Sequence, residues 1–377
     1  MYDAIVVGAR CAGSPTAMLL ARKGYNVLLV DKSTFPSDIM STHYIHPPGV
    51  EFMRSWGVLD ALKATGLPRI KEITMTLGDT TFSPPRPPGA DGEMEAYCPR
   101  RIILDKLLVD FASEAGAEVR EGFSVQELTF DGDRVTGLRG KAKGGAEVTE
   151  EARIVIGADG MHSTVAKALK PREYDTQPSL SFGYYAYWSG VPLNGAELYM
   201  MEDGGVLAFP THHDQACIAV GGPIENFQEF RKDIEAGYFK VLDTTPTLAQ
   251  RVRGGKQEER FIGTADQPNF FRAPFGEGWA LVGDAGYHRD FVTGLGITDA
   301  FRDAGLLSEA IDEGFSGQRP LGEAMAAYEA KRNEIAKPLY DLTLQLVSGD
   351  PPTPEQFMAF GAAMASMMPE AQQVAGA

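Results

Sequence analysis

The chain has 377 residues, 44% of them hydrophobic and 23% charged, which is typical of a globular protein with two or three folding units. Its formal net charge is −16 at pH 7 and no basic cluster stands out, so we expect no nucleic-acid partner. No apolar run is long enough for a membrane span, and the first residues lack the positive charge of a signal peptide, so we expect a cytoplasmic protein.

The cysteine and histidine patterns give no sign of a metal site. Cys11, Cys98 and Cys217 lie far apart and form no C-x-x-C pair, which favours buried thiols over a disulfide framework or a zinc site. The pair His212-His213 has no third ligand at useful spacing and is typical of a hairpin tip. We therefore predict no metal.

The first thirty residues have the order strand, turn, helix, strand. Residues 4–7 are a continuous apolar run, residues 11–23 fit a helix that Gly24 ends, and residues 27–30 are a second apolar run. Continuous apolar strands are typical of a parallel sheet that is covered on both faces. The pattern predicts one βαβ unit of a Rossmann-like domain.

The turn after the first strand resembles a phosphate-binding loop. Gly8 and Gly13 stand at the first and last glycines of G-x-G-x-x-G, with Arg10 at the middle one. In that motif the helix N-terminus binds a pyrophosphate, and an acid about 20 residues later binds a ribose, which is where Asp31 lies. Arg10 must either turn its side chain away or help to neutralise the phosphate. The turn predicts dinucleotide binding, with an ordinary tight turn as the alternative.

Further along, the chain leaves the parallel sheet and returns to it. Residues 104–115 have helical periodicity, and the turn formers at 131–133 and 144–145 indicate a β-meander. Residues 153–156 and 279–282 are further buried strands. Aromatic segments separated by turns in 179–261 indicate an antiparallel sheet.

These patterns predict an α/β protein with a discontinuous first domain and an inserted second one. Towards the end, a helical stripe from Leu321 to Leu346 contains Arg332 and Pro338. It predicts C-terminal helices laid on the first domain, with a dimer seam as the alternative, so the protein is a monomer or a homodimer. We assign 1–73, 98–178 and 262–349 to a Rossmann-like domain of parallel sheet plus β-meander, 74–97 and 179–261 to an antiparallel-sheet domain, and 350–377 to a C-terminal tail.

Two later segments carry a family resemblance. Residues 157–165 read Gly-Ala-Asp-Gly-Met-His-Ser-Thr-Val, and residues 283–304 begin Gly-Asp-Ala, continue through Gly294-Leu295-Gly296 and end Asp303-Ala304. These segments resemble the Asp-Gly and Gly-Asp motifs of FAD-dependent monooxygenases of the para-hydroxybenzoate hydroxylase type. Arg101, followed by Leu104-Asp105, is similar to the arginine that begins the helix beneath the flavin. The resemblance covers most of residues 1–345.

The resemblance implies FAD as the cofactor of the Rossmann-like domain, with NADH or NADPH as electron donor. By the same likeness Asp284 binds the ribityl chain, and the helix after Gly294 stabilises negative charge on reduced flavin. The expected cofactor-binding residues are Gly8, Arg10, Cys11, Ala12, Gly13, Asp31, Lys32, Arg101, Val125, Asp159, Gly283, Asp284, Gly294, Leu295, Gly296 and Ile297.

Few catalytic side chains are needed in such an enzyme, because the flavin forms a peroxide with O2 and the protein binds, orients and excludes water. We expect His46 and His288 to face the flavin, where a histidine can deprotonate a phenol; structural histidines are the alternative. For the inserted, substrate-binding domain, Phe182, Tyr184 and Trp188 share one strand face, with core packing as the alternative. The expected substrate residues are His43, Tyr44, Phe182, Tyr184, Trp188 and Phe209.

The expected function is therefore an FAD-dependent monooxygenase that hydroxylates or epoxidises an aromatic or polyketide-like small molecule. Geranylgeranyl reductases and flavin-dependent halogenases share the fold and the first motif, so an FAD-dependent reductase of carbon-carbon double bonds is the second expectation. A halogenase is third, since the chain has no Trp-x-Trp-x-Ile-Pro segment. A non-enzymatic FAD-binding module is the last alternative.

Overall fold

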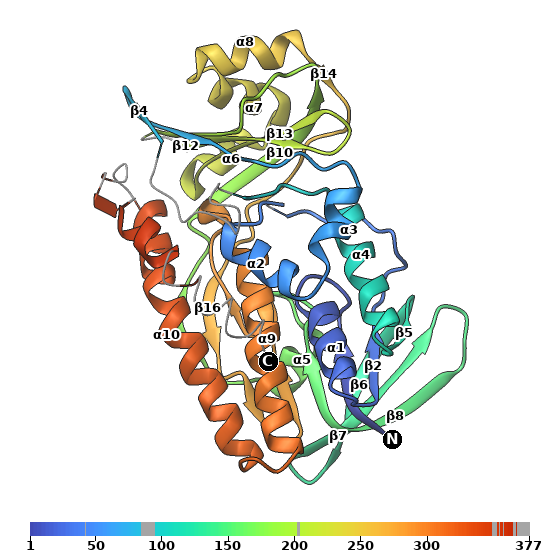
Figure 1. Cartoon of the computed structure of the whole chain (residues 1–377). Helices are drawn as coiled ribbons and strands as arrows, with labels where there is room; N and C mark the ends of the chain where they lie inside the picture. Colours follow the sequence, from blue (N-terminus) through green and yellow to red (C-terminus); the bar gives the residue numbers. More distant parts are fainter. Residues whose placement is uncertain are drawn as a thin grey trace.

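The computed structural model describes residues 1–41, 43–83, 95–201, 204–348, 353, 355–356, 358–364 and 367. In Figure 1 a sheet covered by helices, which contains the N-terminus, forms the lower body, and a second sheet with its own helices lies above it. The predicted α/β architecture is confirmed. No helix in the described ranges is long and apolar enough to cross a membrane.

The lower body is built on a sheet with the strand order β17-β18-β8-β1-β2-β5. The predicted first unit is β1 (Tyr2–Val7), α1 (Gly13–Arg22) and β2 (Val27–Val30), and β1 pairs in parallel with β2 and with β8 (Glu147–Gly157). The remaining strands are β5 (Glu118–Arg120), β17 (Phe275–Gly276) and β18 (Trp279–Leu281). The central parallel strands β1, β2 and the end of β8 are buried on both faces, as their apolar sequences predict, whereas the edge strand β5 is not.

Helices cover one face of this sheet and the β-meander covers the other (Figure 1). The main helices are α1, α4 (Arg101–Glu114) and α9 (Gly296–Phe315), with α10 (Leu321–Val347) packed beside α9. Smaller helices are α2 (Pro47–Ser55), α3 (Leu59–Ala64) and α5 (Thr164–Leu169). The meander consists of β6 (Phe123–Asp131), β7 (Arg134–Ala142) and the first part of β8, which runs on into the parallel sheet.

A small third sheet joins α10 to the rest of the body. It comprises β9 (Glu173–Gln177), β16 (Asn269–Arg272) and β19 (Tyr287–His288). Phe271 and Tyr287 stack at 4.5 Å between ring centroids and pack against Tyr340 of α10. This cluster fixes the loop that holds the Gly-Asp motif.

The upper sheet has the order β14-β10-β13-β12-β11-β3-β4, with β15 also paired to β10. Its strands are β3 (Ile73–Leu77), β4 (Thr80–Phe82), β10 (Ser181–Ser189), β11 (Ala196–Met201), β12 (Gly204–Thr211), β13 (Gln215–Pro223), β14 (Lys256–Gln257) and β15 (Ile262–Thr264). The predicted antiparallel sheet is confirmed, with one exception near its edge, where β3 and β11 pair in parallel. β3 arrives from a distant part of the chain, so no hairpin forces the antiparallel direction.

Helices that the sequence analysis missed cover the far face of the upper sheet (Figure 1). They are α6 (Phe227–Phe230), α7 (Ile234–Leu242) and α8 (Pro246–Gly254). Asp233 caps α7 by accepting a hydrogen bond from the Ala236 amide at 3.0 Å, and Pro246 begins α8. These caps were present in the sequence, but aromatic residues on both sides favoured a reading as strands.

Candidate active site

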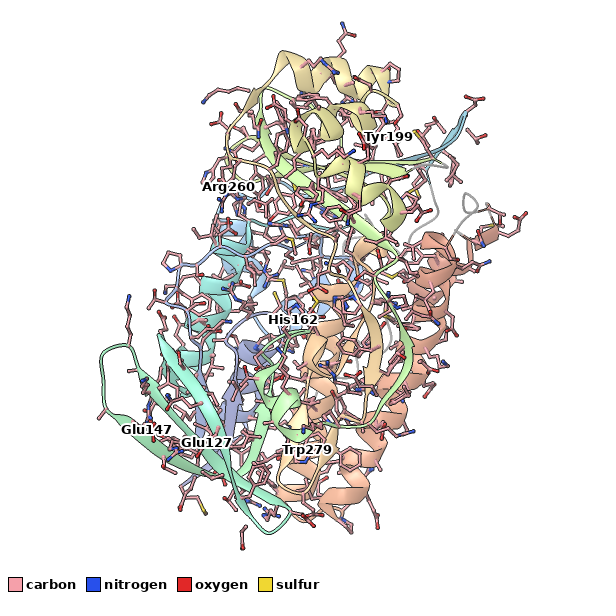
Figure 2. All side chains as sticks on the ribbon, turned by 180° about the vertical axis from the view of Figure 1, so that it is seen from behind. Glu127, Glu147, His162, Tyr199, Arg260 and Trp279 are labelled. Carbon is pink, nitrogen blue, oxygen red and sulfur yellow. The ribbon has the colours of Figure 1, made fainter. Side chains whose placement is uncertain are left out.

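A cavity of about 740 Å³ lies where the carboxyl ends of the parallel strands face the upper sheet. Both bodies line it, and His162, one of its lining residues, lies between them in Figure 2. Ligands of open α/β sheets bind at such strand ends. The cavity therefore has the position expected for a cofactor with a substrate beside it.

In the turn after β1, two positions, Gly8 and Gly13, have room only for glycine. Gly8 has a φ of +104°, and a Cβ on it would lie 2.5 Å from the carbonyl oxygen of Ala158. A Cβ on Gly13 would lie 1.7 Å from the carbonyl oxygen of Gly8. The close approach places the first amides of α1 beside the cavity, where they can bind a pyrophosphate.

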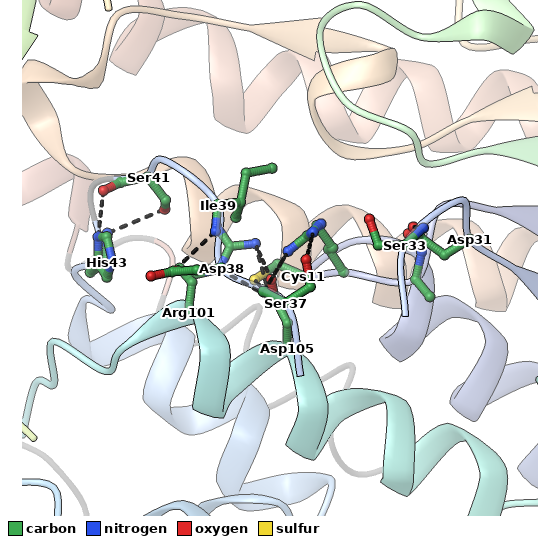
Figure 3. A network of polar contacts seen from close by, with 12 residues as sticks. Cys11, Asp31, Ser33, Ser37, Asp38, Ile39, Ser41, His43, Arg101 and Asp105 are labelled. Atoms are coloured by element: carbon green, nitrogen blue, oxygen red, sulfur yellow. Dashed lines mark hydrogen bonds and ion pairs between the residues drawn. The ribbon is translucent and has the colours of Figure 1, made fainter. Parts of the chain in front are cut away.

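The guanidinium group of Arg10 forms polar contacts with other side chains of the protein. Its Nη1 donates to Asp105 Oδ2 at 2.5 Å, and its Nη2 donates to Ser37 Oγ at 3.2 Å. Asp105 is fully buried and also accepts from Arg101 Nε at 3.0 Å and from the Cys11 thiol (Figure 3). One buried carboxylate is thus shared by two guanidinium groups, which leaves a net positive charge beside the helix N-terminus.

Asp31 lies at the end of β2 with its carboxylate oriented by two amides. Its Oδ2 accepts from Ala9 N and its Oδ1 from Ser33 N, both at 2.7 Å. Each carboxylate oxygen has a second lone pair, and Asp31 lines the cavity. This is the arrangement that a ribose hydroxyl requires.

Asp284 stands opposite, in the turn Gly283–Ala285 that follows β18. It lines the cavity, and burial raises the pKa of its carboxyl group, while His288 and Arg101 oppose that shift. Beyond it, Gly294 has a φ of +65° and Gly296 begins α9, so the amides at this helix start face the same cavity. A carboxylate for sugar hydroxyls and a positive helix end for the ring fit FAD.

Most of the predicted cofactor residues come together here. Lining the cavity are Gly8, Arg10, Cys11, Ala12, Asp31, Lys32, Arg101, Val125, Asp159, Gly283, Asp284, Gly294, Gly296 and Ile297. Gly13 packs beneath Gly8, and Leu295 packs in a small apolar cluster with Leu339. Asp159 accepts from Thr164 N at 2.6 Å and so also orients the start of α5.

The predicted histidines separate into two groups. His46 and His288 line the cavity; His46 Nε2 contacts the Thr293 carbonyl at 2.8 Å, and His288 Nδ1 contacts the Pro268 carbonyl. His43 instead packs fully buried behind the wall, with its Nε2 2.6 Å from the Tyr187 hydroxyl. Burial, aided by the charge of Arg101, lowers the pKa of His43 to about 3, so it is a neutral structural residue.

The predicted aromatic floor needs a correction. Tyr44, Tyr184 and Phe209 line the cavity, but Phe182 and Trp188 point to the far face of the upper sheet. There Trp188 Nε1 donates to the Tyr238 hydroxyl of α7 at 3.2 Å. The helices α6–α8 were not predicted from the sequence. They pack on the face of the upper sheet that carries Phe182 and Trp188.

Apolar residues that sequence reasoning missed form the rest of the wall. Tyr185 lies on the face of β10 opposite to Trp188 and lines the cavity. The alternation of side chains along a strand could have predicted this position. The other missed residues are Ile73, Met75, Leu198, Met200 and Leu207 from the upper sheet, with Leu346, Phe360, Gly361 and Met364 from the C-terminal part. For Phe360 to Met364 no local motif pointed to a site.

Metal chemistry finds no support in the described residues, which contain no cluster of three or more His, Cys, Asp and Glu side chains able to hold an ion. Cys11, Cys98 and Cys217 are buried free thiols, as predicted.

Comparisons with known proteins agree with this geometry. A digeranylgeranylglycerophospholipid reductase of Methanosarcina acetivorans is 27% identical over 364 residues, which cover 91% of this chain and 83% of the relative. The myxobacterial halogenase CndH has a TM-score of 0.84 and 21% identity, covering 99% of this chain and 95% of that one. Pseudomonas aeruginosa PqsL, solved with 2-aminobenzoylacetate, has a TM-score of 0.78 and 21% identity, covering 96% and 99%.

The model of the FAD binding domain family matches residues 1–343, which include the glycine turn, Asp31 and Asp284. The structural neighbours include a probable FAD-dependent monooxygenase, and the sequence relatives include reductases. The chain belongs to the FAD binding domain family and is a flavin oxidoreductase.

Proposed function

We propose that the protein is an FAD-dependent monooxygenase that uses O2 and NADH or NADPH to hydroxylate or epoxidise an aromatic or other hydrophobic small molecule, such as a polyketide-like ring. The observation that carries the proposal is a continuous cavity whose two ends differ. One end has Asp31, Asp284 and two helix starts, and the other has an apolar wall from the upper sheet. Bound FAD supplies the electrons and the activation of O2.

The apolar end provides the environment that an oxygenase needs. Tyr44 and Phe209 stack with ring centroids 5.0 Å apart, and Met75 and Leu207 line the same region. Such walls bind flat apolar molecules and exclude water from the reacting atoms. We infer an aromatic or hydrophobic substrate on this ground.

His288 is our candidate for proton transfer. Its Nδ1 is engaged by the Pro268 carbonyl, an acceptor, so Nδ1 carries the proton and Nε2 of the neutral ring is an acceptor. Nε2 can then take the proton of a phenol that enters the cavity. His46, held by the Thr293 carbonyl, orients the opposite wall and is the second candidate.

The proposal is tested by the consumption of reduced nicotinamide. FAD-loaded protein is mixed with NADH or NADPH in air, with and without members of a panel of phenols. We expect at least one phenol to raise the rate of nicotinamide oxidation with O2 uptake, and His288→Gln to reduce that stimulation about a hundredfold. If no phenol changes the rate, the aromatic substrate class is wrong.

We place the reaction in the cytoplasm, because the three cysteines are free thiols.

A reductase of carbon-carbon double bonds is the second candidate, favoured by the likeness to the Methanosarcina acetivorans reductase along 91% of this chain. It would use the same apolar wall for an alkene. Dithionite-reduced, FAD-loaded protein under argon then saturates an isoprenoid alkene, whereas a monooxygenase gives no product without O2.

A further inference from the structure

A chain of four rings, joined by three contacts, crosses the cavity wall from the upper sheet to the C-terminal segment. Phe209 of β12 stacks on Tyr44 at 5.0 Å, Tyr44 meets His46 at 4.5 Å, and His46 meets Phe360 at 5.9 Å between ring centroids. All four residues line the cavity. The C-terminal segment is therefore part of the same wall as the substrate-facing sheet.

The segment 358–364 is helical and has one inward face. Phe360, Gly361 and Met364 line the cavity, and Met364 packs with Leu295 and Leu339. Met364 follows Phe360 and Gly361 by four and three residues, which places the three on one side of the helix, while Met358 at the start of the segment is 56% exposed. The inward face packs against Leu295, the residue before α9.

We propose that Phe360 and Met364 close the substrate chamber on the side of the C-terminal segment and limit the length of the apolar group that a substrate can carry. The inference rests on the proposed function only in that FAD occupies the part of the cavity lined by Asp31 and Asp284. Leu346, Met200 and Leu198 supply further apolar surface in the same cavity. The substrate class that fits is a ring with an uncharged alkyl or prenyl arm that points to Phe360.

The test uses FAD-loaded full-length protein and a series of 4-n-alkylphenols, from methyl to nonyl, as probes. Binding is followed by the perturbation of the flavin absorbance, which requires no turnover. In the wild-type protein we expect affinity to rise about fourfold for each methylene until the chain reaches Phe360, and then to fall. Phe360→Ala and Met364→Ala should move the best chain length up by about two methylenes.

Met358→Ala is the matched control, because it truncates an exposed side chain of the same segment that does not line the cavity. Phe360→Leu keeps an apolar side chain and serves if the alanine variants lose FAD; a smaller shift of the same sign is expected. Identical length profiles for wild type, Phe360→Leu and Met358→Ala would overturn the inference. So would a failure of every alkylphenol to perturb the flavin.

These outcomes are separate from the fate of the proposed function. If the protein binds the alkylphenols with the expected length limit but never oxidises one, the inference about the chamber holds and the proposed monooxygenase reaction is wrong. If it oxidises phenols with no dependence on Phe360, the proposed reaction holds and the inference about Phe360 is wrong.

Discussion

Arg10 shows at the scale of one residue how a turn that normally holds three glycines accommodates a long side chain. The guanidinium group leaves the pyrophosphate path and binds Asp105 and Ser37. Asp105 would be a costly buried charge without Arg10 and Arg101. The turn therefore keeps its shape through Gly8 and Gly13, whose backbone positions admit no Cβ.

Asp31 is predicted to dominate the affinity for FAD. Asp31→Asn keeps the size of the side chain but removes the charged acceptor, so we expect FAD affinity to fall at least tenfold. Titration of apo-protein with FAD, followed by quenching of flavin fluorescence, measures the effect. Asp133→Asn, in an exposed turn, is the control, and equal affinities in the two variants would rule out the ribose contact.

His43 predicts a pH dependence of stability. Burial lowers its pKa to about 3 from an ordinary 6.5, so the folded protein keeps it neutral while the unfolded chain takes up a proton below pH 6.5. The free energy of unfolding should then fall with decreasing pH between 6.5 and about 3, by up to about 1.4 kcal/mol for each pH unit.

The variant His43→Asn isolates this contribution. Asparagine tolerates the φ of +62° at this position but does not titrate here. Urea unfolding at pH 6 and pH 4 should show a smaller loss of stability in His43→Asn than in the wild type. His213→Asn, at an exposed residue with a φ of +63°, is the control. A wild-type pH slope in His43→Asn would show that another group causes it.

At the scale of elements, among the contacts that attach α10 to the cofactor-binding body, a buried cation, Arg332, makes the most polar ones. Arg332 contacts the carbonyl oxygens of Gly286 at 3.3 Å and Arg272 at 3.2 Å, and the Tyr174 hydroxyl at 3.0 Å. Arg332 is fully buried within the chain, so its place in the apolar stripe of α10 faces the body of the same chain. α10 in turn supports Leu295 and the segment 358–364.

We expect Arg332→Met to lower the free energy of unfolding by about 3 kcal/mol, because the Gly286 and Arg272 carbonyls and the Tyr174 hydroxyl lose a charged donor. The midpoint of urea unfolding measures it. Glu334→Met, two residues along on the exposed side of α10, should lie close to the wild type. A midpoint for Arg332→Met equal to that of Glu334→Met would mean that the other contacts of α10, such as those of Tyr328 and Tyr340, hold it in place.

The sequence pattern predicted the strands that consist of one continuous apolar run. It did not predict which face of a strand lines the cavity, because that depends on segments far away in the sequence. β1, α1, β2 and the end of β8 follow directly from their residues, as do Asp31 and Asp284 at strand ends. Both faces of β10 carry aromatic residues. The sequence of β10 alone therefore does not tell which face packs on α7 and which face lines the cavity. Phe360 joins the site only through His46 and Leu295, which lie far away in the sequence.

At the scale of the whole molecule, the upper sheet separates two apolar environments. Its far face packs on α6–α8 around Phe182 and Trp188, and its near face carries Phe209 toward the cavity. Changes on the far face should therefore alter stability without altering the site. Changes on the near face should do the reverse.

Trp188→Phe and Phe209→Leu form the pair that tests this separation. Trp188→Phe loses the hydrogen bond to Tyr238 and part of its packing, so we expect a loss of about 1–2 kcal/mol in stability with unchanged alkylphenol binding. Phe209→Leu should weaken alkylphenol binding about tenfold through the lost stacking. Weakened probe binding in Trp188→Phe would contradict the assignment of the two faces.

Oxygenation in this cavity can be tested through the origin of the oxygen atom in the product. Photoreduced, FAD-loaded protein is mixed with ¹⁸O2 and a panel of alkylphenols and isoprenoid alkenes, and the masses of the products are measured. We expect a phenol-derived or epoxide product that carries ¹⁸O and is absent under argon. An unlabelled, saturated alkene product formed equally well under argon would contradict oxygenation and establish the reductase.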